Sequence, residues 1–381
     1  MHRIQGGTHL THLLRAALAL LIAVAPLTSQ DSAPSGERDF LTRIRRLTVE
    51  GRRAGEGYWS RDGKRIVFQS EREPGNPFYQ IYVLDLASGE AKRISPGFGK
   101  TTCPFFRPGS DEIIFASTHA DPKSKALQDE ETAIRASGRE RRYSWDYDPE
   151  MDIYAYNEKT AAMRRLTTAR GYDAEGSYSP DGQWVVFTSM RDAYNRQLGE
   201  IEKKQLETDP SYFGEIYIMR ADGSGQKRLT TVSGYDGGPF FTHDGSRIVW
   251  RRFAEKGLIA DVWTMKPDGT DARQITDFGA MSWAPYEHPS GDYIMFASNK
   301  FGFDNFELFI VDTEGTKEPV RVTYSDGFDG LPVPSPDGKM LAWTSSRSGG
   351  GAGQLFLAQW NHEKALEALR HAPPRRPSKK S

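Results

Sequence analysis

The stretch Ser179-Pro180-Asp181-Gly182, followed by Val185-Val186-Phe187, joins a tight turn to a short apolar strand. The same pair of elements occurs six times along the chain. A repeat of this kind is one supersecondary unit that cannot bury its apolar faces alone, so it predicts a stacked or circular architecture. The six turns begin at Ser60, Arg107, Ser179, Thr242, His288 and Ser335, and the strands after them begin at Ile66, Ile113, Val185, Ile248, Ile294 and Met340.

The spacing of the units identifies the architecture. Aligned on Gly63, Ser110, Gly182, Gly245, Gly291 and Gly338, successive units lie 47, 72, 63, 46 and 47 residues apart. Three spacings agree within one residue, so the second and third units contain insertions. A unit of about 40–50 residues with four short strands is typical of a propeller blade. Pro, Gly and β-branched residues punctuate every unit, which excludes a helical solenoid.

Each unit ends in a basic-apolar-Thr or basic-apolar-Ser strand, such as Arg164-Arg165-Leu166-Thr167 and Lys227-Arg228-Leu229-Thr230, except the sixth. The missing strand stands at the other end of the chain, as Arg45-Arg46-Leu47-Thr48. A ring whose last blade takes its outer strand from the N-terminal side leaves no open sheet edge there. We therefore predict an all-β fold over residues 43–360: a six-bladed β-propeller of four-stranded antiparallel blades, closed by the N-terminal strand.

The segments outside the predicted propeller have their own character. Ala16 to Leu27 is an apolar run behind basic residues and is too short to span a bilayer, so residues 1–29 are predicted to be a signal peptide whose cleavage site stays open. Residues 30–42 form a linker, and residues 361–381 a short helix and a basic, Pro-rich tail. We expect a periplasmic or secreted protein without a membrane span.

Composition restricts the partners. The 381 residues carry a net charge of -1 with both signs interspersed, which argues against nucleic-acid binding. The single cysteine, Cys103, stands in an apolar strand and is expected to be a small buried residue rather than a nucleophile. The sequence shows no signal for oligomerisation, and we expect a monomer.

Within a blade, the connections from second to third and from fourth to first strand emerge on one face, called here the long-loop face. Both insertions, near 121–148 and 193–213, fall on it, and residues 130–142 of the first have helical spacing. The fourth-to-first connections carry a Gly-aromatic-Asp pattern. Loops gathered at one end of a rigid scaffold are where binding sites usually lie. The predicted binding residues at this face and the channel mouth are Tyr172, Asp173, Glu175, Tyr235, Asp236, Phe328, Asp329, Tyr143, Trp145 and Tyr147.

The Gly-aromatic-Asp pattern has two interpretations. In one, its carboxylates and rings form an acidic, aromatic-rimmed funnel for a peptide, a cationic group or a metal. In the other, each Asp caps a turn and each ring packs between blades. No known catalytic motif stands in the chain, and no cofactor is expected. His119 with Asp121 and Glu175 is the candidate for a metal site, although the spacing matches no established ligand pattern.

The units resemble the TolB-type propeller repeat, whose pattern is Ser-Pro-Asp-Gly, an apolar strand, Ser-x-Arg, a strand ending in Asp and a closing Arg-Leu-Thr. Ser-x-Arg stands here as Ser70-Glu71-Arg72 and Ser189-Met190-Arg191, and in shortened form as Ser346-Arg347. Bacterial TolB proteins carry an α/β domain ahead of the propeller that engages other Tol components. We expect none here, because the first blade follows the predicted signal peptide and linker. The stretches 145–154, 293–300 and 326–332 are similar to propellers fused ahead of exported zinc aminopeptidases.

This resemblance and the loop pattern together predict an exported, non-catalytic propeller. It would bind a protein or peptide partner through its long-loop face and channel mouth, for example as a cell-envelope or peptidase-associated scaffold. The alternative function is that of a metal-dependent propeller enzyme, either a lyase or a hydrolase, or of an accessory domain of an exopeptidase.

Overall fold

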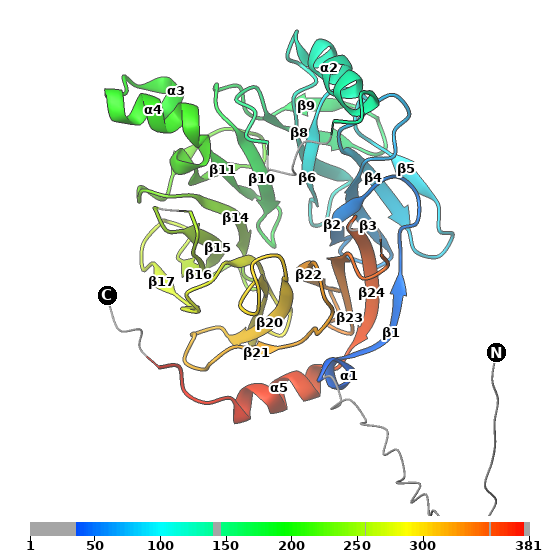
Figure 1. The fold of residues 1–381 in the computed structure, drawn as a ribbon, viewed down its shortest axis with the longest axis vertical. Helices are drawn as coiled ribbons and strands as arrows, with labels where there is room; N and C mark the ends of the chain where they lie inside the picture. The colour runs from blue at the N-terminus through cyan, green and yellow to red at the C-terminus, as the bar shows by residue number, and fades with distance from the viewer. Residues whose placement is uncertain (1–35, 140–145, 256, 350–351, 377–381) are drawn as a thin grey trace, which may run out of the picture. The chain divides into compact units, whose positions relative to one another are not determined.

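Six four-stranded antiparallel sheets surround a central axis in the computed structural model (Figure 1). The structure describes residues 36–139, 146–255, 257–349 and 352–376, and all of its elements belong to the unit Ser35–Ser381. The predicted signal peptide, residues 1–29, lies outside the described residues. The prediction of a six-bladed propeller is confirmed.

The blades follow one another along the chain, each running from the axis outward. Blade 1 comprises β2 (Ala54–Trp59), β3 (Arg65–Ser70), β4 (Gln80–Asp85) and β5 (Ala91–Arg93). Blade 2 comprises β6 (Thr101–Phe106), β7 (Glu112–Ser117), β8 (Asp152–Asn157) and β9 (Met163–Arg165). Blade 3 comprises β10 (Asp173–Tyr178), β11 (Trp184–Ser189), β12 (Glu215–Arg220) and β13 (Lys227–Arg228). Blade 4 comprises β14 (Asp236–Phe241), β15 (Ile248–Phe253), β16 (Ala260–Met265) and β17 (Arg273–Gln274). Blade 5 comprises β18 (Ser282–Glu287), β19 (Tyr293–Ser298), β20 (Glu307–Asp312) and β21 (Val320–Arg321).

Blade 6 closes the ring. It contains β22 (Asp329–Pro334), β23 (Met340–Ser345) and β24 (Gln354–Trp360), and its outer strand is β1 (Leu41–Arg46) from the N-terminal side. Leu41 pairs with Trp360 and Arg46 with Phe356. The predicted closing strand is therefore confirmed, and the two ends of the propeller hold each other in one sheet.

The basic-apolar-Thr pattern, with Ser in blade 1, forms one hydrogen-bonded clamp in every blade. Its hydroxyl donates to a carboxylate or amide oxygen near the start of the third strand and accepts the next backbone N–H. In blade 4, Thr276 Oγ1 lies 3.0 Å from Asp261 Oδ1 and 2.9 Å from the N–H of Val262. In the closing blade, Thr48 Oγ1 lies 2.7 Å from Gln354 Oε1 and 2.9 Å from the N–H of Leu355. The ring closure thus uses the clamp of an ordinary blade.

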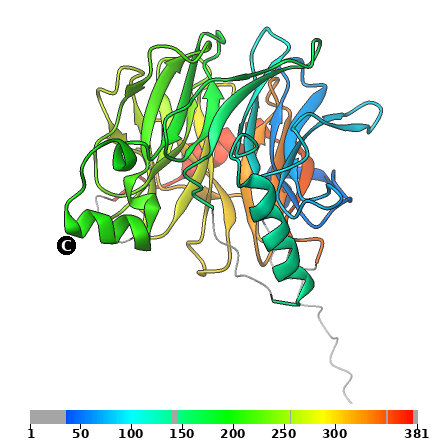
Figure 2. The same ribbon diagram turned by 90° about the horizontal axis from the view of Figure 1, so that it is seen from above.

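The helices lie outside the sheets. The two insertions hold α2 (Ser124–Ala136), α3 (Asp192–Asn195), α4 (Glu200–Thr208) and η1 (Pro210–Phe213), and α2 begins earlier than the helix expected over residues 130–142. Figure 2 shows α2 and α4 projecting from the same face of the ring. At its edge, α1 (Glu37–Phe40) lies beside β1, and α5 (His362–His371) lies beside α1 and β20. None of the described helices has the length and apolar character needed to cross a membrane.

Candidate functional site

The six innermost strands share a bulge that lines the axis. In each, the third residue has a left-handed backbone, with φ between 51° and 58°, and the pairing register shifts at this point. Bulges bend a strand and redirect its side chains. Because alanine and leucine share this strained conformation with two glutamates, the bulge belongs to the fold rather than to a site. The six residues are Glu56, Cys103, Glu175, Gly238, Ala284 and Leu331.

Two positions further along the same strands, aromatic rings fill the axis. Tyr58, Phe105, Phe240 and Tyr286 contact one another with ring centroids 5.0 to 6.4 Å apart. Each inner strand starts at the long-loop face and ends at the opposite, tight-turn face, where the turns between first and second strands lie. The aromatic layer is therefore closer to the tight-turn face than the bulged residues are. The channel therefore has a floor, and the space above it faces the long-loop side.

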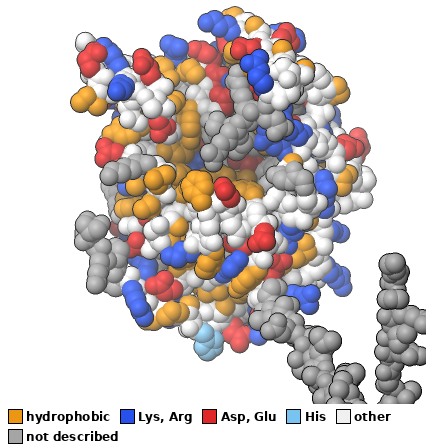
Figure 3. Space-filling view, viewed as in Figure 1, with side chains coloured by type: hydrophobic (Ala, Val, Ile, Leu, Met, Phe, Trp, Pro, Cys, Tyr) orange, Lys and Arg blue, Asp and Glu red, His pale blue; other side chains and the backbone are white. Residues whose placement is uncertain are grey.

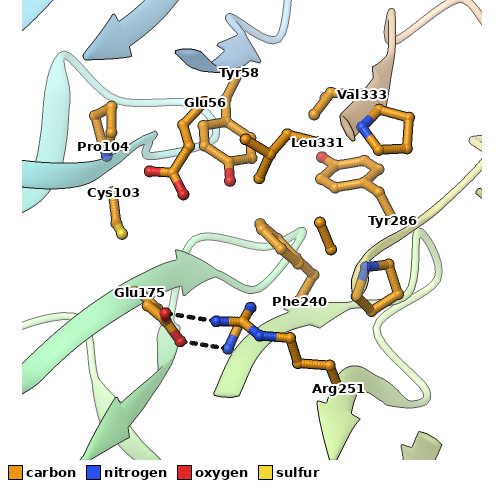
Figure 4. Close-up of a pocket in the computed structure, with 15 residues that line it drawn as sticks. Glu56, Tyr58, Cys103, Pro104, Glu175, Phe240, Arg251, Tyr286, Leu331 and Val333 are labelled. Carbon is orange, nitrogen blue, oxygen red and sulfur yellow. Dashed lines mark hydrogen bonds and ion pairs between the residues drawn. The ribbon is translucent and has the colours of Figure 1, made fainter. Parts of the chain in front are cut away.

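Above this floor lies the axial cavity, the candidate site (Figure 4). The cavity offers about 30 Å³ of space for water molecules, and the whole hollow, including its opening to solvent, measures about 450 Å³. The first volume has room for about two water molecules and is well below that of a usual ligand pocket, while the second includes space open to solvent. The polar lining comes from Glu56, Cys103, Glu175 and Arg251, and the apolar lining includes Tyr58, Phe240, Ala284, Tyr286, Leu331 and Val333.

One wall of the cavity is a buried ion pair between neighbouring blades. Arg251 Nη2 lies 2.8 Å from Glu175 Oε1. The other carboxylate oxygen, Oε2, accepts hydrogen bonds from the Tyr235 hydroxyl at 2.7 Å, from the Thr188 hydroxyl at 2.8 Å and from the N–H of Gly238 at 2.6 Å. Glu175 is therefore saturated with donors inside the protein, whereas Nε of Arg251 has no hydrogen-bond partner in the described part of the chain.

The opposite wall carries an acid of the same type in a different state. Glu56 is 6% exposed, and its Oε2 is buried without a hydrogen-bond donor among the residues that the structure describes. Burial, followed by repulsion from Glu175, raises the pKa of Glu56 from 4.5 to about 7. Figure 4 shows its carboxyl group pointing into the cavity, across from the Glu175–Arg251 pair. The cavity thus contains one acid that can change its charge near neutral pH.

Cys103 stands beside Glu56 in this wall, and burial raises the pKa of its thiol well above the usual value. Nucleophilic attack by cysteine needs the thiolate. The thiol is therefore a packing and hydrogen-bonding group of the lining. The expectation of a buried cysteine is met, although its place beside a channel acid was not foreseen.

Several predicted binding residues meet at the rim of the cavity. Tyr147 packs edge-on against Tyr172 and Tyr235, with ring centroids 5.3 and 5.5 Å away. Tyr235 in turn lies under the guanidinium of Arg251, 5.1 Å from its ring centroid, and the same guanidinium lies 5.5 Å from the ring of Trp283.

The aromatic rim continues into blade 6. The ring of Phe328 lies 6.0 Å from that of Trp283. The residues Tyr147, Tyr172, Tyr235, Trp283 and Phe328, linked partly through Arg251, therefore follow the rim from blade 3 to blade 6. Tyr143 and Trp145, also predicted to bind, lie outside the described residues.

The three predicted aspartates are fully buried in ion pairs. Each pairs with an arginine from the end of its own blade's second strand or just beyond it, at 2.5 to 2.7 Å. Their carboxylates are thus held by internal donors at the mouth rather than standing free. The pairs are Asp173 with Arg191, Asp236 with Arg252 and Asp329 with Arg347.

The candidate metal ligands do not converge. His119 packs on Tyr154 with ring centroids 4.3 Å apart and shares a hydrogen bond of 2.8 Å with the Ser117 hydroxyl. Asp121 accepts the N–H of Lys123 at the start of α2. Among the described residues, no group of three or more His, Cys, Asp or Glu side chains is arranged to hold a metal ion.

Sequence reasoning named Glu175 but missed Glu56, Arg251 and the aromatic floor. A signal was available for the first of these. Aligning the six inner strands places Glu56 and Glu175 at the same third position, and the fourth position is Gly or Pro in every strand. Pro is tolerated inside a sheet at edges and bulges, so this position marks a bulge beside the axis. No comparable pattern marks Arg251, which comes from a second strand.

Exposed apolar side chains gather on the long-loop face. Figure 3 shows this face, with apolar side chains around the central hollow. Of the large apolar side chains that the structure describes as exposed, Ile44 lies on β1, and all the others lie on connections of this face. These are Val49, Phe98, Leu127, Ile201, Val232, Leu258, Ile259, Phe301, Phe303 and Tyr324.

Comparison with known proteins agrees with this architecture. No family model matches the chain. A TolB homologue of Chlorobium luteolum is 25% identical over 225 residues, 55% of this chain and 46% of that protein. An uncharacterised protein of Agrobacterium fabrum is 28% identical over 139 residues, covering 36% and 40%, and the uncharacterised peptidase YuxL of Bacillus subtilis is 24% identical over 150 residues, covering 36% and 22%. The matches thus span less than half of each of these relatives.

Solved structures of several functions share the fold. A putative TolB from Agrobacterium tumefaciens superimposes with a TM-score of 0.54 at 20% identity, covering 81% of this chain and 90% of that one. An oligogalacturonate lyase in complex with manganese gives 0.52 at 16% identity, covering 84% and 94%. A gluconolactonase from Xanthomonas campestris gives 0.55 at 11% identity, covering 84% and 89%. Likeness at these identities shows the fold alone, because propellers carry many unrelated activities.

Proposed function

For this six-bladed propeller with the TolB-type repeat, we propose a binding function: an exported, non-catalytic protein that captures a protein or peptide partner on its long-loop face. The partner would cover the rim of the axial cavity and reach toward its interior. Of the residues predicted to bind, Tyr147 and Phe328 are the contacts proposed at the rim, and Tyr143 and Trp145 are proposed contacts outside the described residues. Six further predicted residues are buried and would support the rim from behind: Tyr172, Asp173, Glu175, Tyr235, Asp236 and Asp329. Cell-envelope and peptidase-associated scaffolds are the settings that fit such a protein.

The observation that carries this proposal is the distribution of exposed apolar residues. On α4, Ile201 is 88% exposed, and in the β19–β20 loop Phe303 is 60% exposed. Scattered apolar side chains are ordinary on a protein surface, but a concentration on one face is a feature of interaction sites. Here the concentration falls on the face that also holds both insertions and the mouth of the cavity.

The rim adds rigid aromatic anchors to this surface. Tyr147 and Phe328, both half-buried, are fixed by neighbouring rings, so they would lose little conformational freedom when a partner binds. Tyrosine and tryptophan side chains dominate the energy of many protein interfaces. A preformed rim beside a hollow suits a segment that inserts a side chain or a chain end.

Peptide selection with matched variants tests the proposal. Peptides selected from a random displayed library on the purified protein are measured by fluorescence anisotropy against the wild type, Phe303→Ser, Ile201→Ser and Ile44→Ser. We expect at least one of the first two variants to weaken binding about tenfold. Ile44→Ser, on the outer strand β1, serves as the control and should bind as the wild type does. Selection of no peptide, or equal losses in all three variants, would refute the proposed surface.

A further inference from the structure

Glu56 is a buried acid whose position the fold does not explain. Every inner strand carries the bulge, and in blades 5 and 6 an alanine and a leucine occupy the same place. Cys103 is a hydrogen-bond partner of the Glu56 carboxyl group, but Oε2 of this group is buried without a donor among the described residues, which costs free energy. The bulge therefore does not require an acid, and the unpartnered Oε2 of Glu56 points to a donor that arrives from outside the described structure.

The surrounding charges select the sign of that donor. The groups facing Glu56 are Glu175 on β10, Arg251 on β15, and the uncharged Cys103, Tyr58 and Tyr286. Because Glu175 and Arg251 neutralise each other at 2.8 Å, the ionised form of Glu56 leaves the cavity with one net negative charge. A positively charged group would balance it, whereas an anion would meet two carboxylates.

The aromatic floor and the volume of the cavity restrict which positively charged group can bind. The rings of Tyr58, Phe240 and Tyr286 form an aromatic surface under the cavity, and such faces attract cations. Space for the centres of water-sized groups amounts to about 30 Å³. An ammonium group of similar size at the end of a thin aliphatic chain suits this space. It also supplies three donors for the free carboxylate oxygen.

We infer that the axial cavity is an anchor pocket for a primary ammonium group of the peptide partner, either a lysine side chain or a chain's amino terminus, with the Glu56 carboxylate as its counter-ion. The inference rests on the proposed function and names the chemistry of its site. Binding of the cation favours ionised Glu56, so the site releases a proton when it is occupied at slightly acidic pH. Raising the pH from 6 to 8 should strengthen binding of a lysine ammonium about tenfold, because Glu56 passes from mostly protonated to mostly ionised.

Small probes test the pocket separately from the whole face. Ligand-observed NMR on the full protein would use Nα-acetyl-lysine methylamide for the side chain and alanyl-alanine amide for the amino terminus. The Nζ-acetylated lysine probe and N-acetyl-alanine methylamide are the uncharged controls, and N-acetyl-alanine is the anionic one. We expect binding of one or both amines, at least a tenfold loss when the amine is acetylated, and the same loss in Glu56→Gln. The amine that binds identifies the source of the ammonium group.

Other outcomes separate the two proposals. Failure of both amines to bind, or equal binding to Glu56→Gln, would overturn the inference. If the anionic probe binds instead, the cavity binds anions through Arg251, and the inference is wrong. Peptides that lose affinity in Phe303→Ser but not in Glu56→Gln would leave the proposed function standing and remove the anchor. Amine binding that is unchanged in Phe303→Ser and lost in Glu56→Gln would support the pocket whatever happens on the outer face.

Discussion

Replacing Glu56 by glutamine should stabilise this protein at neutral pH. Burial, and after it repulsion from Glu175, raises the pKa of Glu56 from 4.5 to about 7 in the folded chain. The folded state therefore holds the proton more tightly than the unfolded state. The corresponding stability is fully present below pH 4.5 and is lost as the pH rises to 7. At about 1.4 kcal/mol per pH unit, the loss amounts to about 3 kcal/mol.

Glutamine has nearly the same shape and cannot ionise. The Glu56→Gln variant should therefore unfold with about 3 kcal/mol more free energy than the wild type at pH 8, and with no comparable gain at pH 4. Urea unfolding followed by tryptophan fluorescence at pH 4, 6 and 8 measures both values. A gain that does not depend on pH, or a destabilisation at pH 8, would refute the reasoning, since either result means that ionised Glu56 has a partner in the folded protein.

Glu175→Gln is the matched control, because the two acids occupy the same bulge position in blades 1 and 3. This change leaves Arg251 buried without its carboxylate, and breaking a buried ion pair typically costs about 3–5 kcal/mol. We expect destabilisation throughout the same pH range. Opposite effects of one substitution at two equivalent positions would show that the neighbouring blade, rather than the residue type, decides what each acid does.

Three further changes test the closure, the tight-turn face and the cavity wall. Thr48→Val and Thr276→Val each remove one clamp and should each cost about 1–3 kcal/mol of stability. Hydrogen exchange should show faster exchange of the β1 amides only in Thr48→Val. Equal exchange of β1 in both variants would contradict closure of the ring by this clamp. Burial lowers the pKa of His288 from 6.5 to about 4, so the free energy of unfolding should fall by about 3 kcal/mol as the pH drops through this range. If His288→Gln unfolds with the same free energy at both ends of the range, the fall belongs to this ring. A fall that persists in the variant would contradict the assignment. Gly238→Ala places a methyl group 2.0 Å from a guanidinium nitrogen of the buried Arg251. The control is Gly89→Ala, at a glycine that also has a positive φ but open space around it, where we expect a loss of roughly 1 kcal/mol. Gly238→Ala should lose more stability than this, and equal losses would mean that the cavity wall rearranges at no cost.

The repeat made the fold predictable, because it records local and regular interactions. Ser179 and Asp181 form the turn hydrogen bonds that the Ser-Pro-Asp-Gly pattern indicates, and Thr167 forms the clamp that the closing pattern indicates. The borrowed strand could be predicted as well, since Thr48 fills a place that the sixth unit leaves empty. Each of these features depends on partners at fixed positions within a unit.

The site depends partly on pairs within one unit and partly on partners in other units, which a repeat does not record. In the sequence Asp173 fits either a channel carboxylate or a turn cap, and Arg191 of the Ser-x-Arg pattern in the same blade pairs with it. Glu175 receives its arginine from the adjacent blade, 76 residues away. Pairings of this kind follow from side-chain geometry across the blade interface, where spacing along the chain gives no guide.

Glu56 shows why the pairing matters more than the residue type. Its counterpart Glu175 has the same backbone conformation and the same register, but only Glu175 receives an arginine and three hydrogen bonds from blades 3 and 4. The ring therefore brings two identical acids to the axis and satisfies one of them. A structural role would have been met by a second arginine or by an apolar residue such as Leu331. An acid with one oxygen left without a donor among the described residues, kept at a stability cost, is the pattern expected of a group whose partner is a ligand.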